Sequence, residues 1–131
     1  SQLKKLQAFK ARRREIVDRY NDAFCKFDEL TLPPDPKNSS ICYHLYTLRF
    51  NNGGETRYEI FHKLRKVKIY CQIHYIPVYW QPYYHRKYGY QTGKCPKAEE
   101  YYSRCLSLPL YPALSNDEVD YIIHSVIDCL Q

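Results

Sequence analysis

The stretch "QIHYIPVYWQPYY", residues 72–84, concentrates side chains that can bind a ligand. His74 can hydrogen-bond through two ring nitrogens, and the unperturbed pKa of histidine lies near neutrality. Tyrosine and tryptophan rings can stack on bases, line a pocket or form a protein interface. Pro77 and Pro82 restrict the backbone, which suits recognition of a single ligand. The rings of this stretch and its continuation are Tyr75, Tyr79, Trp80, Tyr83, Tyr84, Tyr88 and Tyr90.

No catalytic arrangement is found in the sequence. A GxSxG nucleophile elbow is missing, and the 4 glycines form no phosphate-binding loop. The 6 cysteines form no CxxC pair and no zinc-ligand set, so we expect free thiols and a cytoplasmic protein. We assign no catalytic, cofactor-binding or metal-binding residue, and no apolar run is long enough to span a membrane.

Length and charge leave more than one function class open. The 131 residues suit one domain, and 44% hydrophobic residues allow a core. A net charge of +6, concentrated in residues 1–20, raises the question of an anionic partner. From the residues alone, an alternative is a basic, aromatic-rich module without catalytic activity that binds nucleic acid or protein.

Hydrophobic periodicity predicts the elements that must position these side chains. We expect helices at 2–28, 55–66, 96–105 and after Ser115, where Ser115 and Glu118 make a capping box, with one helical turn after Pro82. Strands are expected at 41–50, buried on both faces, and at 67–75, while 106–114 should form a short third strand followed by an extended exit; an extended linker is expected at 31–40. The expected fold class is therefore an α/β (α+β) two-layer sandwich with a small, mainly antiparallel sheet and helices. His74 would end the second strand, a usual place for a ligand-facing side chain.

Four segments together resemble the C-terminal part of the DegT/DnrJ/EryC1/StrS aminotransferases. They are "QLKKLQAFKARRREIVDRYNDAF", "CYHLYTLRF", "IHYIPVYWQPYY" and "CPKAEEYYSRCLSLPLYPALSNDEVDYII". The resemblance covers nearly the whole chain and implies the small domain of a fold type I aminotransferase. Residues 1–131 would form this single C-terminal domain, with 1–28 as a connecting helix and 41–131 as the α/β body. The large N-terminal domain that binds pyridoxal 5'-phosphate would be absent from the chain.

The family aminates nucleotide-linked keto-sugars with pyridoxal 5'-phosphate, and the subgroup that the chain resembles most acts in the pseudaminic-acid pathway. The resemblance implies a homodimeric parent enzyme that transfers an amino group from L-glutamate to a 4-keto-6-deoxy sugar, with no nucleic-acid and no membrane partner. The chain lacks the family's Schiff-base lysine, so alone it should bind no cofactor and be inactive. The segment around His74 would cover the substrate. The implied substrate contacts are His74, Tyr75, Ile76, Pro77, Val78, Tyr79 and Tyr83.

Overall fold

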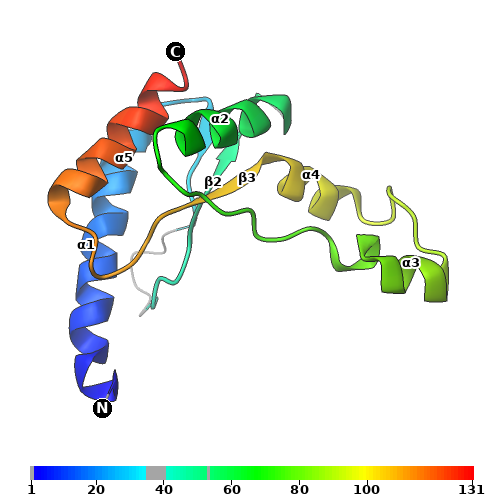
Figure 1. Cartoon of the computed structure of the whole chain (residues 1–131), viewed down its shortest axis with the longest axis horizontal. Helices are drawn as coiled ribbons and strands as arrows, with labels where there is room; N and C mark the ends of the chain where they lie inside the picture. The colour runs from blue at the N-terminus through cyan, green and yellow to red at the C-terminus, as the bar shows by residue number, and fades with distance from the viewer. Residues whose placement is uncertain (1, 35–40, 53) are drawn as a thin grey trace.

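The computed structural model describes residues 2–34, 41–52 and 54–131. No helix in these ranges is both long and apolar enough to cross a membrane. A three-stranded antiparallel sheet packs with helices, which confirms the expected α+β class (Figure 1). The elements follow in the order η1 (Gln2–Lys5), α1 (Leu6–Phe24), β1 (Leu30–Thr31), β2 (Tyr46–Phe50), α2 (Gly54–Lys66), η2 (Val78–Trp80), α3 (Pro82–Tyr88), α4 (Pro96–Arg104), β3 (Cys105–Leu108) and α5 (Asn116–Asp128).

The sheet has the order β1-β2-β3, and its two faces differ in chemistry. Tyr46 lies opposite Leu108 and Leu48 opposite Leu106, and all four are buried. Thr47 lies opposite Ser107 on the other face, because neighbouring side chains of a strand alternate. One face therefore belongs to the core, while the other carries hydroxyl groups.

The core forms where α1, α2 and α5 pack on the apolar face of the sheet. The Tyr20 ring of α1 lies 4.8 Å from the Tyr46 ring of β2, and both side chains are fully buried. The Tyr20 hydroxyl donates to the Pro109 carbonyl at 2.9 Å, and the Tyr46 hydroxyl donates to Asn21 Oδ1 at 2.9 Å. These bonds satisfy polar groups that burial would otherwise leave unpaired, so two large rings can occupy the centre of the core.

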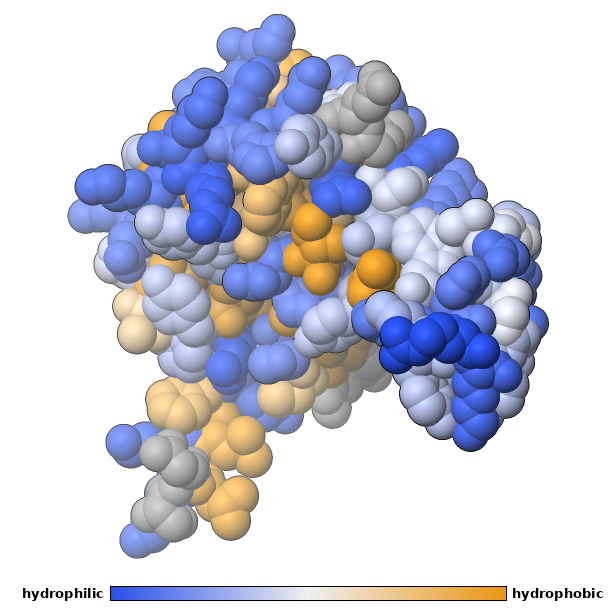
Figure 2. All heavy atoms as spheres, turned by 45° about the vertical axis from the view of Figure 1, so that its right-hand side comes forward, coloured by the Kyte–Doolittle hydropathy of each residue, from blue (hydrophilic) through white to orange (hydrophobic). Residues whose placement is uncertain are grey.

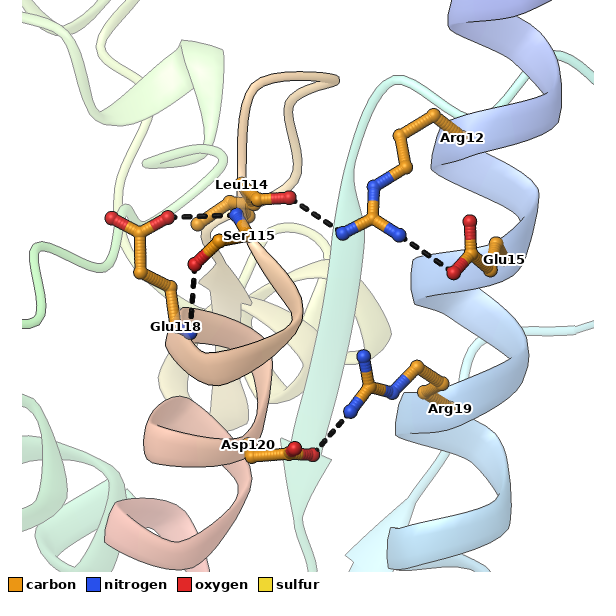
Figure 3. A network of polar contacts seen from close by, with 7 residues as sticks. All are labelled: Arg12, Glu15, Arg19, Leu114, Ser115, Glu118 and Asp120. Carbon is orange, nitrogen blue, oxygen red and sulfur yellow. Dashed lines mark hydrogen bonds and ion pairs between the residues drawn. The ribbon is translucent and has the colours of Figure 1, made fainter.

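Polar contacts join α1 to the start of α5 (Figure 3). Arg12 donates to the Leu114 carbonyl at 2.6 Å, and Arg19 pairs with Asp120 on α5. The capping box at the start of α5 is confirmed: Ser115 Oγ accepts from the Glu118 backbone at 3.2 Å, and the Glu118 side chain accepts from the Ser115 backbone at 2.8 Å. The two helices, distant in sequence, are thus held side by side at their polar edges.

Two of the predicted strands are wrong in extent or in kind. The strand predicted at 41–50 is formed only by Tyr46–Phe50, and its burial alternates, so one face and not both is buried. The strand predicted at 67–75 does not form; its one bridge joins Gln72 to Ser107. The predicted strand is interrupted at its start, because Lys68 has φ 63 and lies in the turn after α2.

The helical predictions agree better with the structure. The helix expected at 2–28 is α1 with a preceding 3-10 turn, and it ends at Phe24 because the chain turns to pair Leu30 with Phe50 of β2. That short strand, β1, was not predicted from the sequence. The turn expected after Pro82 is the longer α3, and α4 begins at Pro96 as predicted. Residues 35–40 of the expected linker lie outside the described residues.

All six cysteines are free thiols, as expected, but their environments differ. Cys71 and Cys105 are buried, whereas Cys42, in the segment expected to be a strand buried on both faces, is exposed. Burial raises the pKa of Cys71 to about 12. Since the thiolate is the nucleophile, both the burial of the Cys71 sulfur and its raised pKa should make it slow to react in the native chain.

We therefore expect iodoacetamide to modify Cys25, Cys42 and Cys95 in the native chain and to leave Cys71 and Cys105 unmodified. Peptide mass spectrometry after a short pulse at pH 8 measures this directly. The same pulse in denaturant serves as the control, because every cysteine is then accessible. Rapid native labelling of Cys71 would contradict the described packing.

Candidate functional site

Residues 74–94, here called the arm, project from the body of the fold. The arm contains η2 and α3, and the main packing contact of α3 is with η2 (Figure 1). Figure 2 shows it as a separate lobe with a surface from pale to hydrophilic. α3 ends at Gly89, whose φ of 64 lets the chain reverse toward α4. The arm thus carries most of the predicted site residues away from the core.

His74 stands where the arm leaves the sheet, and a chain of hydroxyl groups fixes its ring. Its Nδ1 lies 2.9 Å from Ser107 Oγ, which lies 2.9 Å from Thr47 Oγ1. Ser107 is 3% exposed, and it is placed by β3 and by the bridge to Gln72. No described residue hydrogen-bonds to His74 Nε2, so this nitrogen is available to a ligand at the half-buried surface.

The other predicted contacts divide into exposed and packed residues. Tyr75, Val78 and Tyr83 are 73%, 62% and 52% exposed, so their side chains can reach a ligand or another protein surface. Pro77, in contrast, is buried and its carbonyl accepts from the Trp80 backbone at 2.9 Å, a role in forming the turn. Tyr79 is half-buried and its hydroxyl is already engaged by Glu99.

A shallow hollow of about 300 Å³ lies on the arm itself. Of the seven residues predicted from sequence, Ile76 alone is among its lining residues, which are Ile76, Trp80, His85, Tyr90, Gln91 and Thr92. The Tyr84, Tyr88 and Tyr90 rings stack in series, with 6.2 Å and 5.3 Å between successive centroids. The three rings therefore order the arm by packing on one another, although Tyr88 remains 50% exposed.

Glu99 is a residue that the sequence interpretation missed. Nothing in "PKAEEYY" distinguishes it from Glu100. In the structure it lies in the first turn of α4, accepts from the Tyr79 hydroxyl, and accepts from the Gly93 backbone at 2.7 Å. The arm is thus attached to the body by a carboxylate as well as by the chain itself.

This arrangement shifts the acid–base behaviour of both partners. Partial burial and the hydrogen bond with Glu99 raise the pKa of Tyr79 to about 12. The hydrogen bond from Tyr79 lowers the pKa of the Glu99 carboxyl below its ordinary value. A carboxyl whose pKa is lowered by folding stabilises the fold above its unfolded pKa and loses that contribution as the pH falls through the folded pKa. The attachment of the arm is therefore complete at neutral pH.

A larger groove lies away from the predicted residues. Its volume is about 460 Å³, and it runs between the end of α2, the segment after β3 and α5. The rings that line it are those of Tyr70, Tyr111 and Tyr121. No residue predicted from sequence reaches this groove, so its lining adds nothing to the site around His74.

The described residues do not fit a pyridoxal phosphate site. The sequence has one His-Lys pair, His62 and Lys63, and both side chains are exposed on α2. Neither residue lines the large groove or the hollow on the arm, and Lys68, which does line the groove, is exposed, so it offers no enclosed place for the cofactor. A metal-binding group of three His, Cys, Asp or Glu residues is likewise absent from the described ranges.

The family of the chain follows from a match over almost its whole length. Residues 1–127 match the sequence model of the DegT/DnrJ/EryC1/StrS aminotransferase family. The chain belongs to this family. It is 39% identical over 133 residues to the spore coat polysaccharide biosynthesis protein SpsC of Bacillus subtilis strain 168. The aligned region covers 99% of this chain and 34% of SpsC.

Solved structures of aminotransferases show the same fold. The PLP form of the putative sugar aminotransferase Spr1654 from Streptococcus pneumoniae superposes with a TM-score of 0.89 at 30% identity, over 98% of this chain and 33% of that one. Helicobacter pylori PseC, an aminotransferase of pseudaminic-acid biosynthesis, gives a TM-score of 0.89 at 28% identity, over 98% and 34%. The chain thus has the fold seen in part of fold type I aminotransferases and spans about a third of the length of these relatives.

Proposed function

We propose that this chain is the small, C-terminal domain of a sugar aminotransferase that transfers an amino group from L-glutamate to a nucleotide-linked 4-keto-6-deoxy sugar. The observation that carries the proposal is the His74 site within a chain of this family. A histidine with one nitrogen held by Ser107 and the other open can present a hydrogen bond in a fixed direction. Beside it, Tyr75 and Val78 offer exposed apolar surface for a sugar ring or base.

In this proposal the arm forms one wall of the substrate site. His74, Tyr75, Ile76 and Val78 would contact the nucleotide-sugar, and Tyr83 would lie farther out on α3. Pro77 and Tyr79 would shape the wall rather than touch the substrate, because the first is buried and the second is bonded to Glu99. This division refines the sequence-based set, in which all seven residues were substrate contacts.

The cofactor and the second wall would come from the rest of the enzyme. Pyridoxal 5'-phosphate supplies the electron sink on which amino transfer depends. Since the residues of this chain do not fit it, we infer that a large N-terminal domain binds it and that the enzyme is a homodimer. Exposed apolar side chains support such contacts: Leu3 on η1 is 79% exposed, and Leu6 at the start of α1 is 42% exposed.

The finer assignment concerns the sugar and the compartment. Similarity to PseC supports a nucleotide-sugar intermediate of pseudaminic-acid biosynthesis as the substrate. The product would then be UDP-4-amino-4,6-dideoxy-N-acetyl-β-L-altrosamine. We also place the enzyme in the cytoplasm, since six free thiols suit a reducing compartment.

The test is amino transfer by the full-length enzyme that contains this chain. We expect the visible band of bound pyridoxal phosphate to bleach on addition of L-glutamate and to return on addition of a UDP-linked 4-keto-6-deoxy sugar. Nucleotide-sugars carrying dTDP or GDP serve as the comparison set, and mass spectrometry identifies the aminated product. A full-length protein that binds no pyridoxal phosphate would contradict the proposal, and amination of a dTDP or GDP sugar alone would contradict its finer part.

A further inference from the structure

Glu99 joins both limbs of the arm to the body through one carboxylate oxygen. Tyr79 lies on the limb that runs out toward α3, and Gly93 lies on the limb that returns from it. The Tyr79 hydroxyl and the Gly93 backbone both donate to Glu99 Oε1, the second over 2.7 Å. The three residues, here called the Glu99 latch, therefore close the arm into a loop at its base.

Ring packing at the same place makes the latch part of a larger contact. The Trp80 ring stands edge-on to the Tyr102 ring of α4, with 5.6 Å between centroids. Trp80 Nε1 is buried next to the carboxylate without the geometry of a hydrogen bond. The guanidinium of Arg57 on α2 lies 5.7 Å from the Tyr102 ring centre and donates to the Ser103 carbonyl at 3.0 Å. Contacts thus run from the arm through α4 to α2.

Hydrogen bonds to a charged acceptor are stronger than neutral ones, and removal of the acceptor leaves their donors unpaired. Loss of the Glu99 carboxylate would do this to the half-buried Tyr79 hydroxyl, beside an indole N–H that is already buried, and would release the exposed Gly93 N–H to water. The side chain of Glu100, the next residue, forms an exposed ion pair with Arg104 at 3.2 Å, and its carbonyl accepts from Ser103 on the same helix. Of two neighbouring glutamates on α4, one supports the arm and the other does not contact it.

We propose that Glu99 is a positioning residue: it holds the arm against α4 and thereby sets the affinity of the enzyme for its nucleotide-sugar. The inference rests on the proposed function, in which the arm is a wall of the substrate site. An arm that is in place for only a fraction of the time binds substrate with an affinity lowered by that fraction. Glu99 touches no substrate atom in this scheme and acts through the residues on the arm.

The first experiment measures the position of the arm without reference to activity. Trp80 is the chain's 1 tryptophan, so its fluorescence in the 131-residue chain reports the arm alone. We expect Glu99→Ala to increase acrylamide quenching of Trp80 and to speed amide exchange within 75–94, with no such change in Glu100→Ala. Glu99→Gln keeps an oxygen acceptor and should restore most of the native behaviour, as a folding control. Equal quenching and exchange in Glu99→Ala and Glu100→Ala would overturn the latch.

The second experiment measures kinetics of the full-length enzyme with the same variants. We expect Glu99→Ala to raise the KM for the nucleotide-sugar roughly tenfold and Glu99→Gln to raise it roughly threefold at most, with little change in the KM for L-glutamate. A mobile arm with an unchanged KM would overturn the effect on affinity and, with it, the arm as a substrate wall. The arm could also stay in place in Glu99→Ala while His74→Ala still raises the KM for the nucleotide-sugar. That outcome would overturn the latch but leave the proposed function standing.

Discussion

Replacing His74 with alanine in the full-length enzyme raises the KM for the nucleotide-sugar by about 10- to 100-fold, because a hydrogen bond to a charged or strongly polar group contributes roughly 1.5–3 kcal/mol. The substitution does not alter Ser107, so β3 and the bridge from Ser107 to Gln72 remain. The KM for L-glutamate changes less than about twofold, since the amino donor would not contact the arm. Steady-state kinetics with each substrate varied in turn measures both constants.

A matched control uses a histidine outside the site. His124 is exposed on α5, and His124→Ala should leave both Michaelis constants unchanged. Ser107→Ala should raise the KM for the nucleotide-sugar less than His74→Ala does, because the imidazole remains and loses only its fixed direction. Equal kinetics for His74→Ala and the unmodified enzyme would remove His74 from the substrate wall.

Replacing Leu48 with alanine lowers the free energy of unfolding of the chain by about 3 kcal/mol, within the 2–5 kcal/mol range of buried leucine truncations. Leu48 lies on the central strand, faces Leu106 across the sheet and is 0% exposed. The loss has two parts, the apolar surface no longer buried and the cavity left behind. For a chain of this size the midpoint of thermal unfolding should fall by roughly 10 °C.

Leu45→Ala is the control for this second prediction, because the chemistry of the substitution is identical. Leu45 precedes the strand and is 37% exposed, so we expect a loss below about 1 kcal/mol. Urea unfolding followed by circular dichroism measures both variants. Equal losses at the two positions would mean that the strand does not begin at Tyr46 and that 41–50 is buried on both faces after all.

The helices were the part of the fold that the sequence predicted well, and the reason is local. The capping box of Ser115 and Glu118 is formed within one turn, and the apolar period of α5 is completed by neighbouring turns of the same helix. α4 begins at Pro96 because proline has no N–H to lose in a first turn. None of these features needs a distant partner.

The strands depend on partners that the sequence does not name. Residues 67–75 have strand composition, yet only Gln72 pairs, because the turn at Lys68 and the arm beyond His74 leave one position aligned with Ser107. The short β1 forms in a segment without strand signals because α1 ends where Leu30 can reach Phe50. Pairing is decided by which edge is available, and this is a property of the assembled fold.

In the candidate site, too, some features depend on neighbouring residues and others on contacts made by the folded chain. The sequence by itself determined the family, the concentration of rings around His74 and the helices that bound the arm, because each depends on residues close together in the chain. Only the tertiary structure decided that Ser107 holds Nδ1 of His74 and that Glu99, not Glu100, receives Tyr79 and Gly93. The His74–Ser107 and Tyr79–Glu99 contacts join residues 33 and 20 positions apart, and composition cannot show which of two adjacent carboxylates faces the arm. The direction of the histidine and the position of the arm are therefore products of packing.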